Sequence, residues 1–327
     1  MMHNDLTDIA GLAVGQAEDS AVRTGVTLVL FDEPAIAAVD VRGGGPGTRE
    51  SDVLRPGGLV EGVDAIVLSG GSVYGLGAAD AVCAALGAEG RGYALMKQPG
   101  VPVSPIVPAA ILYDLANGGD KDWAGTPPYG RLGRAALEDA RARAPVRLGR
   151  AGAGYGARAG SLPGGTGSAS AVSREGNRVA ALACVNSFGS VRVPGTDRYW
   201  AAPFERGDEF GGLGCAPGAI RELEDWGEAK FNPALRTNTT LAVIATDAAL
   251  TPDQVRRIAI MAQDGLARAI RPVHTPLDGD VVFAAATGKT ALAGPAPLAL
   301  AALGSLAADC LARAVARAVH HACMTDR

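Results

Sequence analysis

The sequence predicts a mixed α/β protein, of the α/β or α+β class, in which strands and helices alternate along one chain. Three observations support this prediction. Hydrophobic residues make up 48% of the 327 positions, which is enough for a substantial buried core. Short β-branched runs alternate with longer amphipathic ones. No low-complexity linker, charge block or fixed-period repeat divides the chain, so we expect one domain over residues 1–327.

In the first two thirds of the chain, the elements are predicted from the spacing of apolar residues. Apolar runs that end in turn residues indicate strands, and alanine or charged residues at helical spacing indicate helices. The predicted strands are 25–31, 36–41 and 64–68, and the predicted helices are 72–86, 132–143 and 219–230.

The C-terminal quarter has the clearest pattern. Residues 240–246 are apolar on both alternating faces, as in a strand buried between two layers. Thr251, Pro252 and Gln254 then supply the N-cap, the first-turn proline and the capping-box partner of a helix.

Two further segments complete the expected elements. The sequence Asp278-Gly279-Asp280 is a turn signal, and it precedes a strand predicted at 281–286. The apolar stretch 295–319 is interrupted by polar residues, so it predicts a helix packed inside the protein and no membrane span.

Charge and cysteine content restrict the partners and the compartment. The net charge is −4 and 20% of residues are charged, so we expect no nucleic-acid partner. The interruptions in the stretch 295–319 lead us to expect no membrane partner either. Five scattered cysteines form no C-x-x-C pair, which fits a reducing compartment. The first residues contain no signal-like pattern, so the expected location is cytoplasmic. No motif calls for a cofactor or a metal ion.

Two glycine-rich segments approach known motifs without matching them. Residues 42–50 lack the ordered G-x-G-x-x-G spacing and contain Pro46, so we expect a structural loop beside an active site. Residues 70–75 resemble a nucleophile elbow, but Tyr74 stands where glycine is required, which favours a tight strand-to-helix turn.

His274 is the one histidine in a plausible loop, so a Ser-His-Asp relay has at most one candidate base.

Residues 236–247 run from a polar stretch directly into a fully apolar strand. This junction resembles that of the DmpA-type L-aminopeptidase/D-esterase family of self-processing N-terminal-nucleophile peptidases. Within the family it looks most similar to the nylon-oligomer (6-aminohexanoate oligomer) hydrolases. Further segments match in the same order along the chain: 40–52, 69–76, 152–154 and 274–280.

The resemblance implies a fold, a processing event and an assembly. The fold is a four-layer αββα sandwich of the type shared with ornithine acetyltransferase. The chain is expected to cut itself between Asn238 and Thr239, giving an α subunit 1–238 and a β subunit 239–327. A homo-oligomer is implied as well, for example a tetramer of processed heterodimers.

The chemistry at this junction is consistent with the resemblance. A threonine hydroxyl is a poor nucleophile without an adjacent base, and a freed α-amine has a pKa of about 8. Cleavage before Thr239 would therefore create the nucleophile and its base together. The resemblance implies that Asp278 and Asp280 hold and polarise this amine. Without it, the same Asp-Gly-Asp would be interpreted as an Asx turn with solvent-facing acids.

Two more site residues come from the resemblance. Asn186 corresponds to an asparagine that stabilises the oxyanion through its amide, although alone it would be a turn residue. Tyr113 corresponds to a tyrosine whose hydroxyl donates to the reacting amide, and a buried core tyrosine is the alternative interpretation.

The chain departs from the family pattern at one position. Family members commonly carry a lysine in the segment after a Gly-Ala-Gly strand, expected here at residues 152–154, whereas residues 159–165 contain none. Arg158 is close in sequence, but its guanidinium does not deprotonate and is no simple replacement. Either this lysine is dispensable, or the rate, the processing or the choice of substrate has changed.

The expected function is hydrolysis of amide bonds through an acyl-enzyme on Thr239. The implied substrates are small amides or peptides with small, D- or β-amino N-terminal residues, or linear or cyclic 6-aminohexanoate oligomers. Two alternatives stay open: acyl transfer similar to that of ornithine acetyltransferase, and an unprocessed binding homologue without turnover.

Overall fold

The computed structural model describes residues 2–60, 62–218, 226–230 and 238–325. Its main elements are β1 Leu12–Asp19, β2 Thr24–Val41, β3 Thr48–Arg49, β4 Val63–Ser69, α1 Gly77–Ala88, β5 Ala109–Ile111, α2 Tyr129–Arg141, β6 Arg158–Ala159, β7 Leu162–Pro163, β8 Gly165–Val172, β9 Arg178–Asn186, β10 Thr239–Ala248, α3 Pro252–Ala269, β11 Val281–Thr290 and α4 Ala296–Thr325. Strands and helices alternate, as the sequence predicts.

The strand β2 joins the two halves of the sheet. The strand order is β3-β5-β4-β2-β11-β10-β9-β8, with β1 also paired to β2. The first half of β2 pairs with β1 and β4, and its second half pairs with β11. The segments predicted as separate strands at 25–31 and 36–41 are one continuous 18-residue strand. Each half of this strand pairs with different neighbours, and these long-range pairings are not visible in the local sequence pattern.

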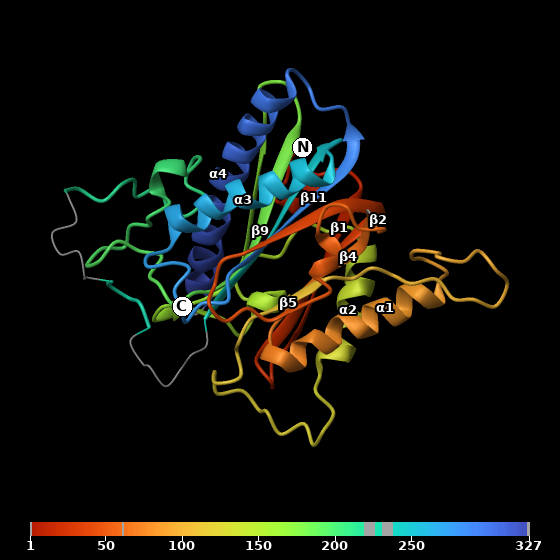
Figure 1. Ribbon diagram of the computed structural model, residues 1–327. Coiled ribbons are helices and arrows are strands. Elements are labelled where there is room, and N and C mark those ends of the chain that lie inside the picture. The colour runs from red at the N-terminus through yellow and green to blue at the C-terminus, as the bar shows by residue number, and fades with distance from the viewer. Residues whose placement is uncertain (1, 61, 219–225, 231–237, 326–327) are drawn as a thin grey trace.

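Three hydrophobic cores establish a four-layer αββα order (Figure 1). The middle core joins Phe31 and Ile66 of one sheet half to Val243 and Phe283 of the other. An outer core packs α3 and α4 on β9, β10 and β11. The other outer core packs α1 and α2 on β1, β2 and β4. The predicted sandwich is confirmed.

The strand β10 lies near the middle of its sheet half. It runs antiparallel to β9 and parallel to β11, and α3 provides the crossover between the parallel pair. All ten residues are buried, and successive side chains point to opposite cores: Val243 faces the inner core and Ile244 faces the helices. This explains the double-sided apolar pattern in the sequence.

The helix α3 begins where the capping residues predict. The Thr251 side chain accepts a hydrogen bond from the Gln254 backbone N–H, and the Gln254 side chain accepts one from the Thr251 N–H, with Pro252 as the first helical residue. Both ends of the capping box are thus formed.

The helix α4 is, among the described residues, the one helix whose length and composition would suit a membrane span. In the most apolar part of α4, 61% is buried inside the protein. It packs against α3, β8 and β9, so its apolar residues serve the outer core. This agrees with the packed helix predicted at 295–319.

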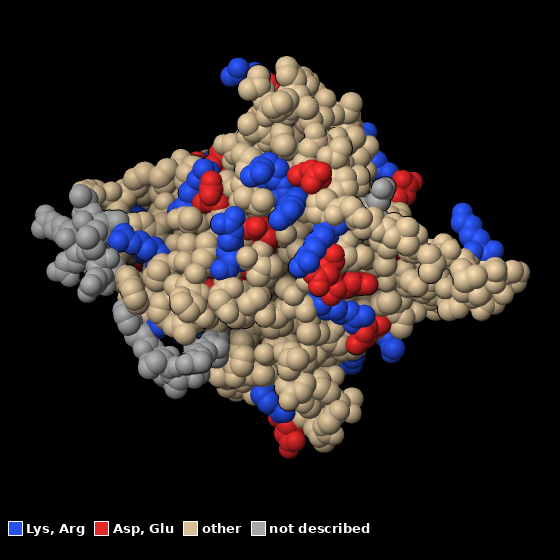
Figure 2. Space-filling model, viewed as in Figure 1, with Lys and Arg blue, Asp and Glu red and all other residues tan. Residues whose placement is uncertain are grey.

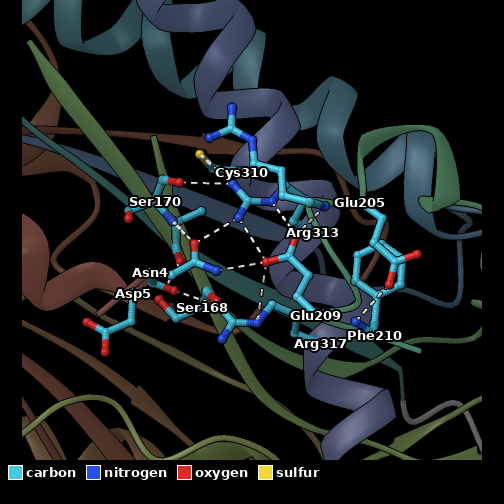
Figure 3. A network of polar contacts seen from close by, with 12 residues as sticks. Asn4, Asp5, Ser168, Ser170, Glu205, Glu209, Phe210, Cys310, Arg313 and Arg317 are labelled. Atoms are coloured by element: carbon cyan, nitrogen blue, oxygen red, sulfur yellow. Dashed lines mark hydrogen bonds and ion pairs between the residues drawn. The ribbon is translucent and has the colours of Figure 1, made fainter. Parts of the chain in front are cut away.

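A buried polar network ties α4 to distant parts of the chain (Figure 3). Arg313, on α4, makes a two-point contact with Glu209, with N–O distances of 2.6 and 2.9 Å. It also donates to the Asn4 side chain and to the Ser170 carbonyl. The N-terminal segment, β8 and the segment around residue 209 are therefore all bound to one arginine.

Three local predictions had different outcomes. Residues 152–154, expected to be a strand, form a 3₁₀ helix. Residues 226–230 are turn and irregular structure and not the end of a helix, and residues 219–225 lie outside the described residues. The tight turn predicted at 70–75 is present, with Gly71 in the left-handed region at a φ of 84°.

Candidate active site

Thr239 begins β10, at the end of the strand that faces the turn 275–280. Its Cα lies opposite that of Asn186 on β9. The Thr239 hydroxyl donates to the carbonyl oxygen of Asn238 over 2.5 Å, and the Gly279 N–H donates to the same oxygen over 2.8 Å. Only 5% of Thr239 is exposed. The carbonyl at the expected cleavage site therefore lies between a hydroxyl and a backbone N–H donor.

Gly279 lies against the hydroxyl, and its lack of a side chain is a steric requirement. A Cβ at this position would stand 2.6 Å from Thr239 Oγ1 and 2.8 Å from the carbonyl oxygen of Gly45. Both distances are shorter than real Cβ contacts, and the second one is to backbone. The glycine of Asp278-Gly279-Asp280 thus allows the turn to approach the start of β10 closely.

Asp280 links this turn to the strand. Its Oδ1 accepts a hydrogen bond from the Thr240 N–H over 2.7 Å. Its Oδ2 accepts one from the His274 N–H over 3.1 Å and lies 2.9 Å from His274 Nδ1. The sequence did not assign His274 to this site, although it placed the residue in the matching segment 274–280.

Asp278 is bound from two sides. Its Oδ1 accepts from the Phe188 N–H, and its Oδ2 accepts from the N–H and the hydroxyl of Thr275. Burial, followed by the negative charge of Asp280, raises the pKa of Asp278 above its ordinary value. Both aspartates are 1% exposed, so the alternative of a turn with solvent-facing acids does not hold.

Asn186 ends β9, and its side-chain amide is held at both ends. Its Oδ1 accepts the Arg158 N–H over 2.9 Å, and its Nδ2 donates to the Tyr113 carbonyl over 3.0 Å. Tyr113 is half-buried and does not belong to the core. The observed contact between Tyr113 and Asn186 is through the tyrosine main chain.

Lys230 is a site residue that the sequence interpretation missed. Its Nζ lies 3.3 Å from the Asn186 carbonyl oxygen and 3.4 Å from Asn186 Oδ1. Burial lowers the pKa of Lys230 to about 7; the charge of Asp278 opposes this shift and that of Arg158 adds to it. One signal was available, because lysines account for only four of the 30 cationic residues.

The glycine run 43–45 supports the turn from outside. The Gly45 N–H donates to the Asp278 carbonyl, and the Gly43 N–H donates to that of Asp280. A Cβ on Gly43 would lie 2.2 Å from the Asp280 nitrogen. The prediction of a structural loop beside the site is confirmed.

An arginine-lined cavity of about 280 Å³ lies next to the Asn186 side of the site. It is lined by Arg23, Asn117, Arg150 and Arg158, among others. The Arg158 backbone N–H donates a hydrogen bond to the side-chain oxygen of Asn186.

No group of three or more His, Cys, Asp or Glu side chains suited to a metal ion occurs within the described residues.

The fold places the chain in a known structural class. The structure of an L-aminopeptidase D-Ala-esterase/amidase from Ochrobactrum anthropi, described as a variant of the Ntn hydrolase fold, superposes with a TM-score of 0.68. The superposition covers 96% of this chain and 85% of that one, at 24% identity. The chain thus has the Ntn (N-terminal-nucleophile) hydrolase fold.

The chain belongs to peptidase family S58, whose model matches residues 4–326. An uncharacterized aminopeptidase of Mycobacterium tuberculosis is 45% identical, over 98% of this chain and 94% of its own length. A 6-aminohexanoate-oligomer endohydrolase of Kocuria sp. is 31% identical, over 86% and 74%. The family resemblance is confirmed, and the protein is a hydrolase that acts on amide or peptide bonds.

Proposed function

We propose that this hydrolase processes itself between Asn238 and Thr239 and then uses Thr239 as its N-terminal nucleophile. One observation supports this most directly: the Thr239 hydroxyl and the Gly279 N–H both contact the carbonyl oxygen of Asn238. The nucleophile, the bond to be cut and a donor for the developing negative charge are thereby within contact of one another.

In the processing step, Thr239 Oγ1 attacks the carbonyl carbon of Asn238. The C–N bond between the two residues breaks, the hydroxyl proton ends on the new α-amine, and an ester joins the two fragments. Water then hydrolyses the ester and leaves the carboxylate on Asn238. Gly279 N–H is positioned to stabilise the tetrahedral oxyanion of the first step.

In turnover, the freed amine of Thr239 acts as the base for its own hydroxyl. The hydroxyl attacks a substrate amide, the amine product leaves with a proton, and water hydrolyses the acyl-enzyme. Asp280, bound to the neighbouring Thr240 N–H, is the carboxylate that would orient the amine. Asn186, directly across from Thr239, would donate to the substrate oxyanion.

The proposed substrates are small amides or peptides. The mycobacterial relative, named an aminopeptidase, is more similar to this chain than the 6-aminohexanoate-oligomer endohydrolase, at 45% against 31% identity. This favours peptides with free N-termini over nylon oligomers, which stay the second substrate class to assay.

We also propose a cytoplasmic homo-oligomer of processed heterodimers. The loop between α1 and β5 projects from the body of the protein (Figure 1). It exposes Leu95, Met96 and Val101, and Figure 2 shows few charged residues on the projecting part. Exposed apolar side chains of this kind are suited to contacts between subunits.

A denaturing gel with intact-mass measurement tests the processing. Wild-type protein should give two fragments, the smaller beginning at Thr239, and T239A should stay whole. The matched control is T240V, because the adjacent Thr240 hydroxyl is buried and has no hydrogen-bond partner among the described residues. This variant should process at the wild-type rate.

Two results would overturn the proposal. A wild-type chain that stays whole after prolonged incubation would favour an unprocessed binding protein. Transfer of an acetyl group to an amine such as glutamate, in place of release to water, would favour an acyltransferase.

A further inference from the structure

Lys230 is a half-buried lysine beside the proposed oxyanion donor. We propose that Lys230 is a positioning residue for this site: its ammonium group holds the amide of Asn186 in one orientation and polarises it toward the substrate oxyanion. The inference rests on the proposed function, because it assigns Lys230 a role through Asn186.

The backbone holds Lys230 in place independently of its side chain. The Lys230 N–H donates to the Phe188 carbonyl over 2.9 Å, two residues after Asn186. The Ser161 N–H donates to the Glu228 carbonyl over 2.8 Å. A Cβ on Gly160 would stand 2.1 Å from that same carbonyl oxygen, so glycine is needed for this approach.

The contacts of the Asn186 amide fix its orientation. Its oxygen has two donors, the Arg158 N–H at 2.9 Å and Lys230 Nζ at 3.4 Å, while its nitrogen donates to the Tyr113 carbonyl. A flipped amide would set its NH₂ against both donors. A positive charge on the oxygen side also draws electron density from the amide N–H bonds, which makes them stronger donors.

The charge of Lys230 also has a partner in the site. The negative charge of Asp278 favours the ammonium form, and it opposes burial and the positive charge of Arg158. The positive charge of Lys230 thus partly compensates the negative charge of Asp278, while the same ammonium group contacts Asn186. Asp278 and Asn186 are both 3% exposed or less and Lys230 is half-buried, so water screens these interactions less than it would on the surface.

Lys230 accounts for the missing lysine noted in the sequence. The segment that lacks one, residues 159–165, contacts the segment that carries Lys230, through the bond from Ser161 to Glu228. A cation therefore reaches this site from a part of the chain that is distant in sequence.

The test compares Lys230 variants after processing. K230M removes the charge and keeps the length, and we expect kcat for a small amino-acid amide to fall about 10- to 100-fold with KM changed less than about threefold. K230R, which keeps the charge, should retain more activity than K230M. The control K289M removes an exposed lysine on β11 and should match wild type.

Rescue by added amine separates positioning from architecture. Added methylamine should raise the kcat of K230A at least about fivefold and should leave the kcat of wild type unchanged. Unchanged kcat in K230M would overturn the inference, and so would a folded K230A without rescue. Failure of both variants to fold would also count against it, because Lys230 would then serve the architecture.

The two proposals fail in different ways. A wild-type protein without processing or turnover would overturn the proposed function and this inference together. A wild-type protein that processes and turns over, with a K230M variant that does the same, would overturn the inference alone.

Discussion

At the scale of single residues, the site depends on close approach between two backbones. Gly279 lets the turn 275–280 contact the start of β10, so that its N–H reaches the carbonyl of Asn238. The flanking aspartates then face in different directions, Asp278 toward Phe188 and Asp280 toward Thr240. One glycine therefore positions both the N–H that contacts the Asn238 carbonyl and two carboxylates.

We expect G279A to process at least about 100-fold more slowly than wild type. The added Cβ would collide with the Gly45 carbonyl and the Thr239 hydroxyl, and displacement of reacting groups by about 1 Å has costs of this size. Fragment formation followed over time on a gel measures the effect. The control is G77A, because a Cβ at Gly77 would meet no neighbour. Processing of G279A at the control rate would contradict the steric role.

Asp114 gives a prediction about pH. It follows Tyr113 and accepts hydrogen bonds from the Thr24 hydroxyl and the Gly71 N–H. Burial raises the pKa of Asp114 to about 6. Between its ordinary value and 6 the folded state binds more protons than the unfolded state, so its contribution to stability falls as pH rises through this window.

The comparison of wild type with D114N isolates this contribution. Wild type should lose up to about 3 kcal/mol relative to D114N between pH 4 and pH 7. Urea unfolding at several pH values measures the difference. Parallel stability curves for the two proteins would show that Asp114 does not titrate in this range.

At the scale of elements, β10, α3 and β11 form the unit that brings the site together. The parallel pair β10 and β11 needs a crossover, and α3 supplies it. The turn 275–280 directly precedes β11, so the register of β11 beside β10 sets the position of both aspartates. The cap of α3 therefore supports the frame of the site.

We expect T251A to lower the free energy of unfolding by about 1 kcal/mol, because the N-cap contact to Gln254 is lost. T251S keeps the hydroxyl, so its free energy of unfolding should fall by less than about half of the loss in T251A. Urea unfolding of unprocessed T239A protein, with each change added, avoids complications from cleavage. Equal losses in T251A and T251S would contradict the cap.

Predictability from the sequence differed between local and long-range features. The strand β10 and the helix α3 were predicted because their signals are local: a double-sided apolar run, a cap and a helical stripe. The continuity of β2 was not, because its pairing partners are strands far along the chain. Lys230 was missed for the same reason, since its contacts to Asn186 and Phe188 cross about 40 residues.

At the scale of the whole molecule, the buried network of Figure 3 joins segments from both ends of the sequence. Burial alone would raise the pKa of Glu209, but the hydrogen bond and charge of Arg313 outweigh it and lower the pKa. The pair is thus kept in its charged form inside the protein. Removal of one partner leaves the other charge buried without compensation.

We expect E209Q to destabilise the protein by about 3 kcal/mol. The control E138Q breaks the exposed contact between Glu138 and Arg141 and should cost less than about 0.5 kcal/mol. Chemical denaturation of unprocessed T239A protein measures both. Similar losses in the two variants would mean that Arg313 finds another partner.

The proposed cut would divide the central strands of the sheet between two polypeptides. Asn4 and Glu209 belong to the fragment before the cut, whereas Arg313, β10 and β11 belong to the fragment after it. In the processed form, two separate polypeptides share one sheet, with β10 and β11 between β9 and β2. Their first folding was a unimolecular event, but refolding would require two chains to meet. The lifetime of the mature enzyme would then be set by its unfolding rate, with no route back at low concentration.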